Sequence, residues 1–383
     1  MEWTHFTVEE NLPGTGWGTG GIGLADFDGD GDLDLAVSRR DTRTAYWYER
    51  RDDATWVRHE MGSSPELEDT LGAAALDVDG DGHVDVAFNG VWFENPGGLD
   101  DDPDADWTGH EYDGGGHDVV AADLDGDGRD ELVTYDGETL AWFDTVRDLA
   151  KHVVVDGRDD HGGVGPRGVG DLSGDGTLDL VLPGAWFENP RLDGTSDGDW
   201  IRHEWPHEPV PDASYGTSAR VWVADLNGDG HEDIVYSDCD TGFSHVYWVE
   251  NHGGGEAWTR HQLPDPPGAP RTGSFHSLGV ADFTGDGTLD VFAGEQEDDD
   301  DYMTEDGRLP MKPPGLKERG VVWRNSGGRD TTFDSAVFQR GKPGWHDAAI
   351  GDVDGDGNVD IVSKVWSTDG TYHVDFWRND TEQ

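Results

Sequence analysis

The chain has 383 residues, and its 83 Asp and Glu side chains outnumber 26 Lys and Arg, for a net charge of −57. This acidity excludes a nucleic-acid-binding protein of the usual kind, which needs a basic face against phosphate, and disfavours contact with anionic membranes. No apolar run approaches the roughly 18 residues that span a bilayer, so we expect no membrane insertion. The single cysteine, Cys239, excludes an intrachain disulfide and a zinc site built of thiolates.

The aromatic content indicates a folded chain despite the acidity. Acid-rich, apolar-poor chains are often disordered, but disordered chains are poor in aromatics. This chain has 17 Trp and 13 Phe. Residues 1–6 show no basic segment followed by an apolar one, so we expect no signal peptide. The protein would then be cytoplasmic if Met1 is the native start, and extracellular if a signal segment was removed.

The net charge predicts that the stability of the folded state depends on salt concentration. Like charges repel across a compact surface, and salt screens them, with a Debye length of about 3 Å at 1 M. We therefore expect the folded state to lose stability below about 0.5 M salt. Thermal unfolding followed by circular dichroism over a salt series measures this. Full stability in dilute buffer would show that the acidity is not a halophilic adaptation.

One Asp-rich loop repeats seven times, with the pattern D-x-[DNST]-G-D-G-x-x-[DE] followed by apolar residues. In chain order the copies are 26–34, 77–85, 123–131, 171–179, 225–233, 282–290 and 352–360. Units of about 55 residues with several short strands have the size of a propeller blade. The spacing therefore predicts an all-β, seven-bladed β-propeller.

Each unit also repeats its strands. An apolar strand runs into the loop, a second leaves it, a third carries a Trp, and most units add a fourth with Trp-x-x-His. The third-strand tryptophans are Trp47, Trp92, Trp142, Trp186, Trp248, Trp323 and Trp377. The fourth-strand histidines, which we interpret as structural, are His5, His59, His110, His152, His203 and His261. Helix signals are nearly absent.

The two ends of the chain together supply the strands of the seventh unit. The seventh unit stops after the Trp377 strand, and Trp3-Thr4-His5 resembles the missing fourth strand. We expect residues 2–9 to supply that strand, because an open propeller would leave an exposed sheet edge. Residues 1–383 then form a single domain, with blade seven shared between 341–383 and 2–9. We expect a monomer.

The loops predict Ca²⁺ sites. Acidic side chains at positions 1, 3, 5 and 9 and a backbone carbonyl at position 7 match the first nine residues of an EF-hand loop, and hard oxygen ligands select Ca²⁺. The expected ligands, loop by loop, are Asp26, Asp28, Asp30, Asp32 and Asp34; Asp77, Asp79, Asp81, His83 and Asp85; Asp123, Asp125, Asp127, Arg129 and Glu131; Asp171, Ser173, Asp175, Thr177 and Asp179; Asp225, Asn227, Asp229, His231 and Asp233; Asp282, Thr284, Asp286, Thr288 and Asp290; and Asp352, Asp354, Asp356, Asn358 and Asp360.

The seven loops are not equivalent. Ser173, Asn227 and Thr284 replace the acid at position 3 in the fourth, fifth and sixth loops. We expect these three loops to bind Ca²⁺ more weakly, because affinity follows the number of charged ligands.

The repeated loop, with D-x-D-G-D-G-x-x-D followed by Leu-Ala or Ile-Val, resembles the FG-GAP/VCBS repeat propellers over essentially the whole chain. The resemblance implies the seven-bladed fold and structural Ca²⁺, up to seven ions. It does not specify a function, since that family includes integrin-type adhesion heads, lectin-like modules, carbohydrate lyases and a fungal sugar dehydratase. The Asp-rich, Lys-poor composition resembles that of haloarchaeal proteins.

The face opposite the Asp loops is the expected ligand site. Six residues before the first Asp of a loop, three units carry His117, His276 and His346. With them we expect Arg167, Arg220, Lys364 and Tyr215 as catalytic groups. The expected substrate-binding residues are Trp17, Trp345, Trp366, Glu295 and Asn89; the first three, like Trp205, are loop tryptophans outside the repeat and offer stacking surfaces for sugars.

A catalytic divalent metal is not supported by the sequence. His276 and His346 come from adjacent blades, but His117 lies three to four blades away, across the mouth. A zinc site built from these three histidines alone would therefore be strained.

The sixth unit contains an insertion, residues 295–319, which is read either as a solvated acidic loop or as a lid over the channel. Lys312, Lys317 and Lys364 belong to this side of the ring in a Lys-poor chain. They favour an anionic ligand such as a uronate.

Two functions remain open. The first is binding or processing of a carbohydrate; as an enzyme, a lyase or dehydratase fits best, with His or Tyr taking a proton α to a carbonyl and a cation holding the enolate charge. Serine hydrolase, kinase and zincin motifs are missing, while a retaining glycosidase stays open. The second is a non-enzymatic, calcium-dependent adhesion or protein-interaction module.

Overall fold

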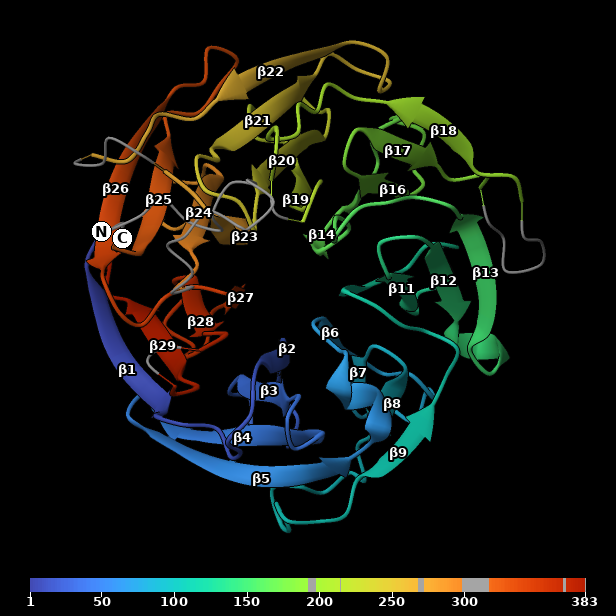
Figure 1. Ribbon diagram of the computed structural model, residues 1–383, viewed down its shortest axis with the longest axis vertical. Helices are drawn as coiled ribbons and strands as arrows, with labels where there is room; N and C mark the ends of the chain where they lie inside the picture. Colours follow the sequence, from blue (N-terminus) through green and yellow to red (C-terminus); the bar gives the residue numbers. More distant parts are fainter. Residues whose placement is uncertain (192–197, 214, 268–271, 298–316, 368–369, 383) are drawn as a thin grey trace.

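The computed structural model describes residues 1–383 except 192–197, 214, 268–271, 298–316, 368–369 and 383. Seven antiparallel sheets stand around a central opening, and each sheet is one blade (Figure 1). Within the described residues the only helical segments are two 3₁₀ turns, η1 (Pro65–Glu68) and η2 (Thr145–Arg147). The all-β, seven-bladed propeller expected from the repeat is confirmed.

The strands follow the chain from the axis outwards in blades one to six. Their bounds are, for blade one, β2 (Thr19–Ala25), β3 (Asp34–Arg39), β4 (Thr44–Asp52) and β5 (Thr55–Ser63); for blade two, β6 (Ala73–Leu76), β7 (Asp85–Phe88), β8 (Val91–Glu94) and β9 (Thr108–Glu111); and for blade three, β10 (Asp118–Ala122), β11 (Glu131–Tyr135), β12 (Leu140–Asp144) and β13 (Ala150–Val155).

The next three blades keep this order. Their bounds are, for blade four, β15 (Val169–Gly170), β16 (Asp179–Leu182), β17 (Ala185–Glu188) and β18 (Ile201–Glu204); for blade five, β19 (Ala219–Ala224), β20 (Asp233–Asp238), β21 (Val246–Asn251) and β22 (Trp258–Gln262), with β14 (Pro166–Arg167) added in parallel to β19; and for blade six, β23 (Phe275–Ala281), β24 (Asp290–Glu295), β25 (Arg319–Asn325) and β26 (Phe333–Arg340).

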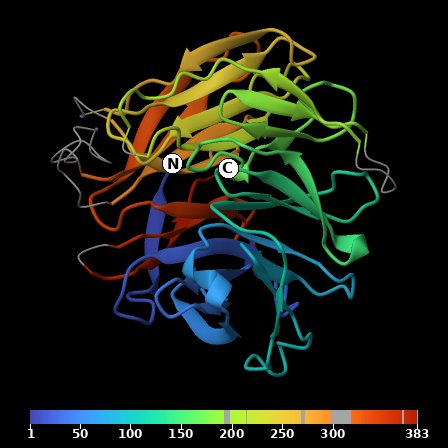
Figure 2. The same cartoon turned by 45° about the vertical axis from the view of Figure 1, so that its right-hand side comes forward.

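Blade seven is built from both ends of the chain. It contains β27 (Asp347–Gly351), β28 (Asp360–Lys364) and β29 (Val374–Asn379), and its outermost strand is β1 (Trp3–Glu9). Strand β1 pairs antiparallel with β29, so that His5 lies opposite Trp377. The two termini accordingly lie side by side in both views (Figures 1 and 2). The N-terminal strand closes the ring, as the sequence predicted.

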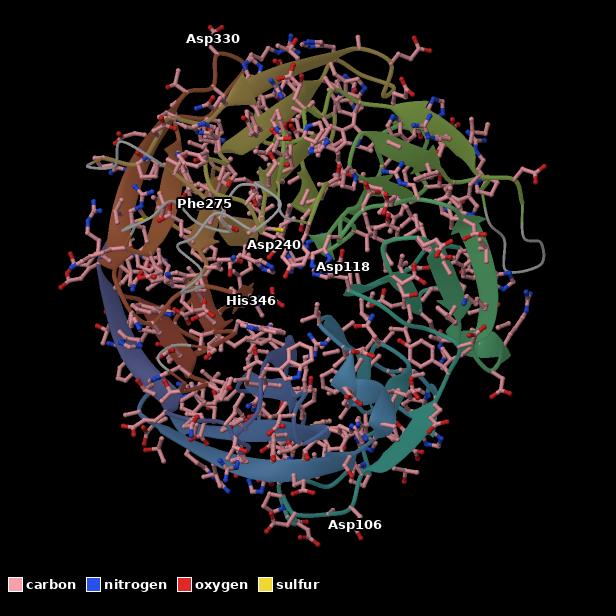
Figure 3. The ribbon with its side chains drawn as sticks, viewed as in Figure 1. Asp106, Asp118, Asp240, Phe275, Asp330 and His346 are labelled. Atoms are coloured by element: carbon pink, nitrogen blue, oxygen red, sulfur yellow. The ribbon has the colours of Figure 1, made fainter. Side chains whose placement is uncertain are left out.

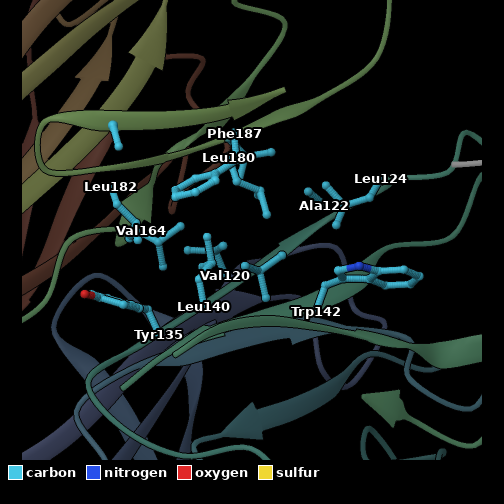
Figure 4. Packing of buried hydrophobic residues seen from close by; sticks show 13 residues of the cluster. Val120, Ala122, Leu124, Tyr135, Leu140, Trp142, Val164, Leu180, Leu182 and Phe187 are labelled. Atoms are coloured by element: carbon cyan, nitrogen blue, oxygen red, sulfur yellow. The ribbon is translucent and has the colours of Figure 1, made fainter. Parts of the chain in front are cut away.

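The core lies between neighbouring blades. Between blades three and four, Val120, Leu140 and Trp142 pack against Leu180 and Phe187 (Figure 4). The repeated histidine of the outermost strand stacks on the repeated tryptophan beside it, as in Trp186–His203, where the ring centroids are 4.1 Å apart. The same stacked pairing joins Trp47–His59, Trp92–His110, Trp142–His152, Trp248–His261 and Trp377–His5.

An asparagine at the end of the third strand, which the sequence analysis did not single out, joins adjacent blades. Asn95 of blade two donates from Nδ2 to the Phe27 carbonyl of blade one at 2.9 Å, and its backbone N–H donates to Asp85 at 2.8 Å. The equivalent inter-blade bonds are made by Asn189, Asn251, Asn325 and Asn379. The Asp loops are therefore tied to the neighbouring blade as well as to their own.

Candidate functional site

The Asp loops form one end of the ring, and their backbones fold around their own carboxylates. In the first loop, Gly29 and Gly31 both donate backbone N–H bonds to Asp26, at 2.7 and 3.1 Å. Both glycines have positive φ, 82° and 99°, a conformation that glycine adopts without strain. Asp34, at position 9, is buried and accepts from the Arg50 backbone N–H at 2.9 Å.

Four loops bring three carboxylates close enough to share a cation. Their oxygens lie within 4.8 Å of one another in the sets Asp26–Asp28–Asp34, Asp77–Asp79–Asp85, Asp123–Asp125–Asp127 and Asp352–Asp354–Asp356. These are the four loops with an acid at position 3. The loops carrying Ser173, Asn227 and Thr284 form no such set among the residues that the structure describes.

The chemistry of these loops fits a hard cation. Asp28 Oδ2 and Glu131 Oε1 are buried and have no hydrogen-bond partner within the described chain. Burial raises the pKa of Asp34 and of Glu131 to about 8, with neighbouring loop carboxylates adding to the effect. A cation bound at the loop would favour the ionised carboxylates and so lower these pKa values.

A cavity of about 300 Å³ opens at the other end of the ring. Its walls come from loops and innermost strands of several blades, and Asp118, Asp240 and His346 mark the region beside the central opening in Figure 3. The residues that line the cavity are Trp17, Arg40, Leu71, His117, His161, Tyr215, Asp240, His276, His346 and Trp366. We call it the mouth cavity.

Four histidines converge in the mouth cavity. The ring centroids of His276 and His346 are 3.9 Å apart, those of His117 and His276 are 6.4 Å apart, and those of His117 and His161 are 4.9 Å apart. His117 lies closer to His276 than its separation along the ring suggested, but the three histidines form no metal-binding set among the described residues. The innermost strands converge on the axis, so that His117 beside blade three and His276 of blade six face each other across it.

The histidines surround a buried carboxylate. His276 Nε2 lies 3.5 Å from Asp240 Oδ2, and Ser218 Oγ donates to the same oxygen at 2.8 Å. Burial by itself would raise the pKa of Asp240, but the interactions with His276, His161 and His117 hold that pKa well below its usual range. Asp240 is therefore ionised over the working pH range of most proteins.

His346 has a different environment. It is buried, and Lys364 Nζ lies 3.4 Å from His346 Nδ1. Burial, together with His276 and Lys364, holds the pKa of His346 well below 6.5, so the ring is neutral at pH 7. Burial also lowers the pKa of Lys364 to about 8. Lys364 thus lies behind His346 rather than in the cavity wall.

An ion-paired layer lies beneath the histidines. Arg220 is buried and donates to Asp118 at 3.2 Å and to Asp347 at 2.9 Å, joining blades three, five and seven. A second space of about 620 Å³ extends from this layer along the innermost strands towards the Asp loops. Arg220, expected as a catalytic group, lines this second space and not the mouth cavity.

Aromatic faces form the rim of the mouth cavity. The Trp17 side chain is 54% exposed and that of Tyr215 is 50% exposed. Tyr215 stacks on His161 with centroids 4.6 Å apart, and the Trp366 ring lies 5.1 Å from that of His346. Trp17, Trp366 and Tyr215 are thus placed at the mouth, as expected.

Arg40 places a cation against two of these rings. Its guanidinium lies 4.1 Å from the Trp17 ring centroid and 5.2 Å from that of Trp366. Its Nε donates to the Glu68 carbonyl at 2.6 Å, which fixes the side chain against the cavity wall.

Trp345 is a core residue and not a stacking surface. It is fully buried, and its ring lies 4.9 Å from that of Trp377 and 5.2 Å from that of Phe292. Its Nε1 donates to Gln339 at 2.9 Å. Trp205 is also buried, with Nε1 bonded to the Leu182 carbonyl.

The burial of Trp345 and the exposure of Trp17 predict different effects of their substitution on the free energy of unfolding. We expect Trp345→Ala to lower the free energy of unfolding by about 3–5 kcal/mol, because it leaves a large cavity in a packed core. Trp17→Ala should change it by less than about 0.5 kcal/mol, since the ring is half exposed. Urea unfolding curves of the two variants measure the difference; equal losses would contradict the assignment.

Three other expected site residues have structural partners instead. Glu295 is buried and paired through both carboxylate oxygens with Arg319. Asn89 is buried and accepts from Thr70 Oγ1 at 2.8 Å. Arg167 lies in β14 and lines the lower channel, with its guanidinium 5.8 Å from the Trp222 ring centroid.

The sequence analysis missed His161, Asp240 and Arg40. Each of these residues lies near a blade strand at a position where the other units carry a different residue. This departure from the repeat is the signal that could have identified them. Of the insertion expected as a lid or an acidic loop, residues 298–316, including Lys312, lie outside the described residues. Lys317 is exposed. No helix in the described part of the chain has the length and hydropathy to cross a membrane.

Known proteins share this architecture. The model of the FG-GAP-like repeat matches residues 26–88 and 225–293. The protein is a seven-bladed β-propeller, and it carries FG-GAP-like repeats. No curated protein matches the chain in sequence.

Two solved structures are similar in fold. An Agrocybe aegerita lectin, described for its specific recognition of non-reducing terminal N-acetylglucosamine, matches with a TM-score of 0.55 at 18% identity, over 94% of this chain and 85% of its own. A streptogramin B lyase matches with a TM-score of 0.52 at 11% identity, over 98% of this chain and 97% of its own. At these identities the similarity concerns the fold alone.

Proposed function

We propose that the protein binds a carbohydrate in the mouth cavity, on a propeller stabilised by Ca²⁺ in its Asp loops. The observation that carries this proposal is the pairing of half-exposed aromatic faces, Trp17 and Tyr215, with buried polar groups in one cavity of about 300 Å³. Sugars are recognised by stacking of their apolar faces on aromatic rings and by hydrogen bonds to a few fixed polar groups. The recognition of N-acetylglucosamine by a lectin of similar fold agrees with this.

Arg40 favours an anionic sugar. The guanidinium lies against two aromatic rings at the rim, and Arg binds a carboxylate through two parallel hydrogen bonds. A uronate placed on Trp17 would bring its carboxylate towards this cation.

As an enzyme, the protein would be a lyase or dehydratase. A neutral imidazole is required to take a proton α to a carboxylate or carbonyl, and His346 is neutral at pH 7 because burial lowers its pKa. His276 lies against it with a ring-centroid separation of 3.9 Å. Arg40 would hold the negative charge that develops on the substrate.

The rim aromatics provide the test of binding. We expect Trp17→Ala and Tyr215→Ala each to weaken sugar binding by about 2- to 13-fold, because one stacked ring contributes roughly 0.5–1.5 kcal/mol. A glycan array identifies the ligand, and isothermal titration calorimetry measures the loss. The control is Ile201→Ala, on the outermost strand β18, where the side chain is 55% exposed. Unchanged affinity in both rim variants would exclude the mouth cavity as the sugar site.

Turnover separates the enzyme from the binding module. Incubation with polyuronates and keto-sugars, followed by the absorbance of unsaturated products, detects elimination. Product formation that is lost in His346→Ala supports a lyase. Binding without turnover supports a lectin-like module.

The Ca²⁺ proposal rests on the three-carboxylate sets of the first, second, third and seventh loops and on the unpartnered oxygens of Asp28 and Glu131. Each ion would bind side-chain oxygens and the position-7 carbonyl. Its role would be structural, since the loops lie at the end of the ring opposite the mouth cavity.

A further inference from the structure

Three potential metal ligands of different chemistry meet at the wall of the mouth cavity. Cys239 and Asp240 follow β20 of blade five, and His276 lies on β23 of blade six. Asp240 has φ 54°, in the left-handed region. This conformation is uncommon for residues other than glycine.

The three side chains are buried and close together. They are 1%, 6% and 2% exposed, respectively. One ligand atom from each lies within 4.8 Å of the other two. Tetrahedral zinc sites have metal–ligand distances of about 2.0–2.3 Å, which places their donor atoms roughly 3–4 Å apart. Small side-chain rotations would bring the three donors to that spacing.

One ring nitrogen of His276 faces the cluster, since Nε2 lies 3.5 Å from Asp240 Oδ2, and the other has no partner in the described part of the chain. Nδ1 of His276 is buried and has no hydrogen bond within the described residues. Buried polar atoms are nearly always satisfied, so such an atom in a polar cluster points to a missing ligand. Ser218 Oγ lies 3.1 Å from Cys239 Sγ and 2.8 Å from Asp240 Oδ2, which holds the other two donors on the same side.

We propose that Cys239, Asp240 and His276 bind one divalent transition-metal ion of the zinc type, with a coordination position open to the mouth cavity. A sulfur, oxygen and nitrogen donor set suits Zn²⁺, whereas the all-oxygen Asp loops suit Ca²⁺. On binding, the Cys239 thiol loses its proton to solvent, and the metal–sulfur bond forms with the resulting thiolate.

The open position follows from the lining residues. Asp240 and His276 border the mouth cavity, and His117 and His161 face them across it. A metal here would polarise an oxygen of the molecule that occupies the cavity. The metal proposal does not depend on whether that molecule is a carbohydrate.

The test uses the full chain in saturating Ca²⁺, so that the Asp loops are occupied. Titration calorimetry with Zn²⁺ should give one site per chain. Co²⁺, used as the spectroscopic probe, should give a thiolate-to-metal charge-transfer band that disappears in Cys239→Ser. His276→Gln and Asp240→Asn should weaken Zn²⁺ binding by about 100-fold or more.

His203→Gln is the matched control, because it alters a histidine of β18 that stacks on Trp186 and should leave Zn²⁺ affinity unchanged. Circular dichroism melts identify any variant that fails to fold, and the remaining variants then decide. The proposal is overturned if no stoichiometric Zn²⁺ site appears, if the Co²⁺ band persists in Cys239→Ser, or if His276→Gln and His203→Gln bind Zn²⁺ equally.

Discussion

Chelation of Ca²⁺ at constant salt should lower the melting temperature by about 10 °C or more. A site that binds only the folded state contributes about 2.7 kcal/mol when the ion is present at 100 times its dissociation constant. Four occupied loops would together rival the whole stability of a typical domain, about 5–15 kcal/mol. The buried, raised-pKa carboxyls of Asp34 and Glu131 give the reason, since each loses its compensating charge when the ion leaves.

Differential scanning calorimetry with EGTA measures this loss, and elemental analysis verifies that the ion has been removed. Restoration by Ca²⁺ alone attributes the effect to the Asp loops, because the mixed-donor site at the mouth would need Zn²⁺. A matched pair of variants at loop position 5, Asp30→Asn in a four-acid loop and Asp229→Asn in a three-acid loop, should show the larger loss for Asp30. An unchanged melting curve after verified removal would exclude structural Ca²⁺.

Deletion of residues 1–9 should cause a comparably large loss, seen as aggregation or a collapse of the unfolding free energy. Strand β1 covers β29, with His5 stacked on Trp377 at 4.1 Å and Trp3 stacked on Phe338 at 4.7 Å. Without it, β29 becomes an exposed sheet edge and blade seven loses its link to the start of the chain.

Removal of residues 1–2 alone is the control, because these residues precede β1. Size-exclusion chromatography and urea unfolding compare the two truncations with the full chain. If the 1–9 deletion unfolds like the intact protein, then the closing strand does not contribute to the stability of the ring.

The fold was predictable because a repeated loop marks every blade. Spacing alone located the seven units, and the resemblance of Trp3-Thr4-His5 to the outer strands located the closure. The inter-blade asparagines, such as Asn95, were visible in the same alignment of units but had no assigned role until their hydrogen bonds were seen.

The site was less predictable because distance from the Asp loop does not determine where a side chain points. Trp345 and His346 are neighbours in sequence at the bend before β27, yet Trp345 is buried in the core and His346 lines the mouth cavity. Glu295 pairs with Arg319, which lies at the other end of the insertion, so the pair could not be predicted from the repeat. Arg167 is carried away from the mouth because β14 pairs with β19 of the next blade.

Asp240 and His161 have no counterpart in the other units, so comparing units could mark them as exceptions but could not place them at the mouth cavity. Their importance comes from the narrowness of the ring, which brings blades three, five and six to one point. Repeat spacing places residues along a blade, but it does not give the width of the channel between blades.

The location of a bound sugar is the most direct test of carbohydrate binding in the mouth cavity. Crystals of the full chain, grown in Ca²⁺ and soaked with the glycan that binds best on the array, would show it. We expect a sugar ring against Trp17 or Tyr215, with the polar groups of the sugar directed towards Asp240 and the histidines of the mouth cavity. A sugar bound between blades at the outer rim, with the mouth cavity free of it, would contradict the account.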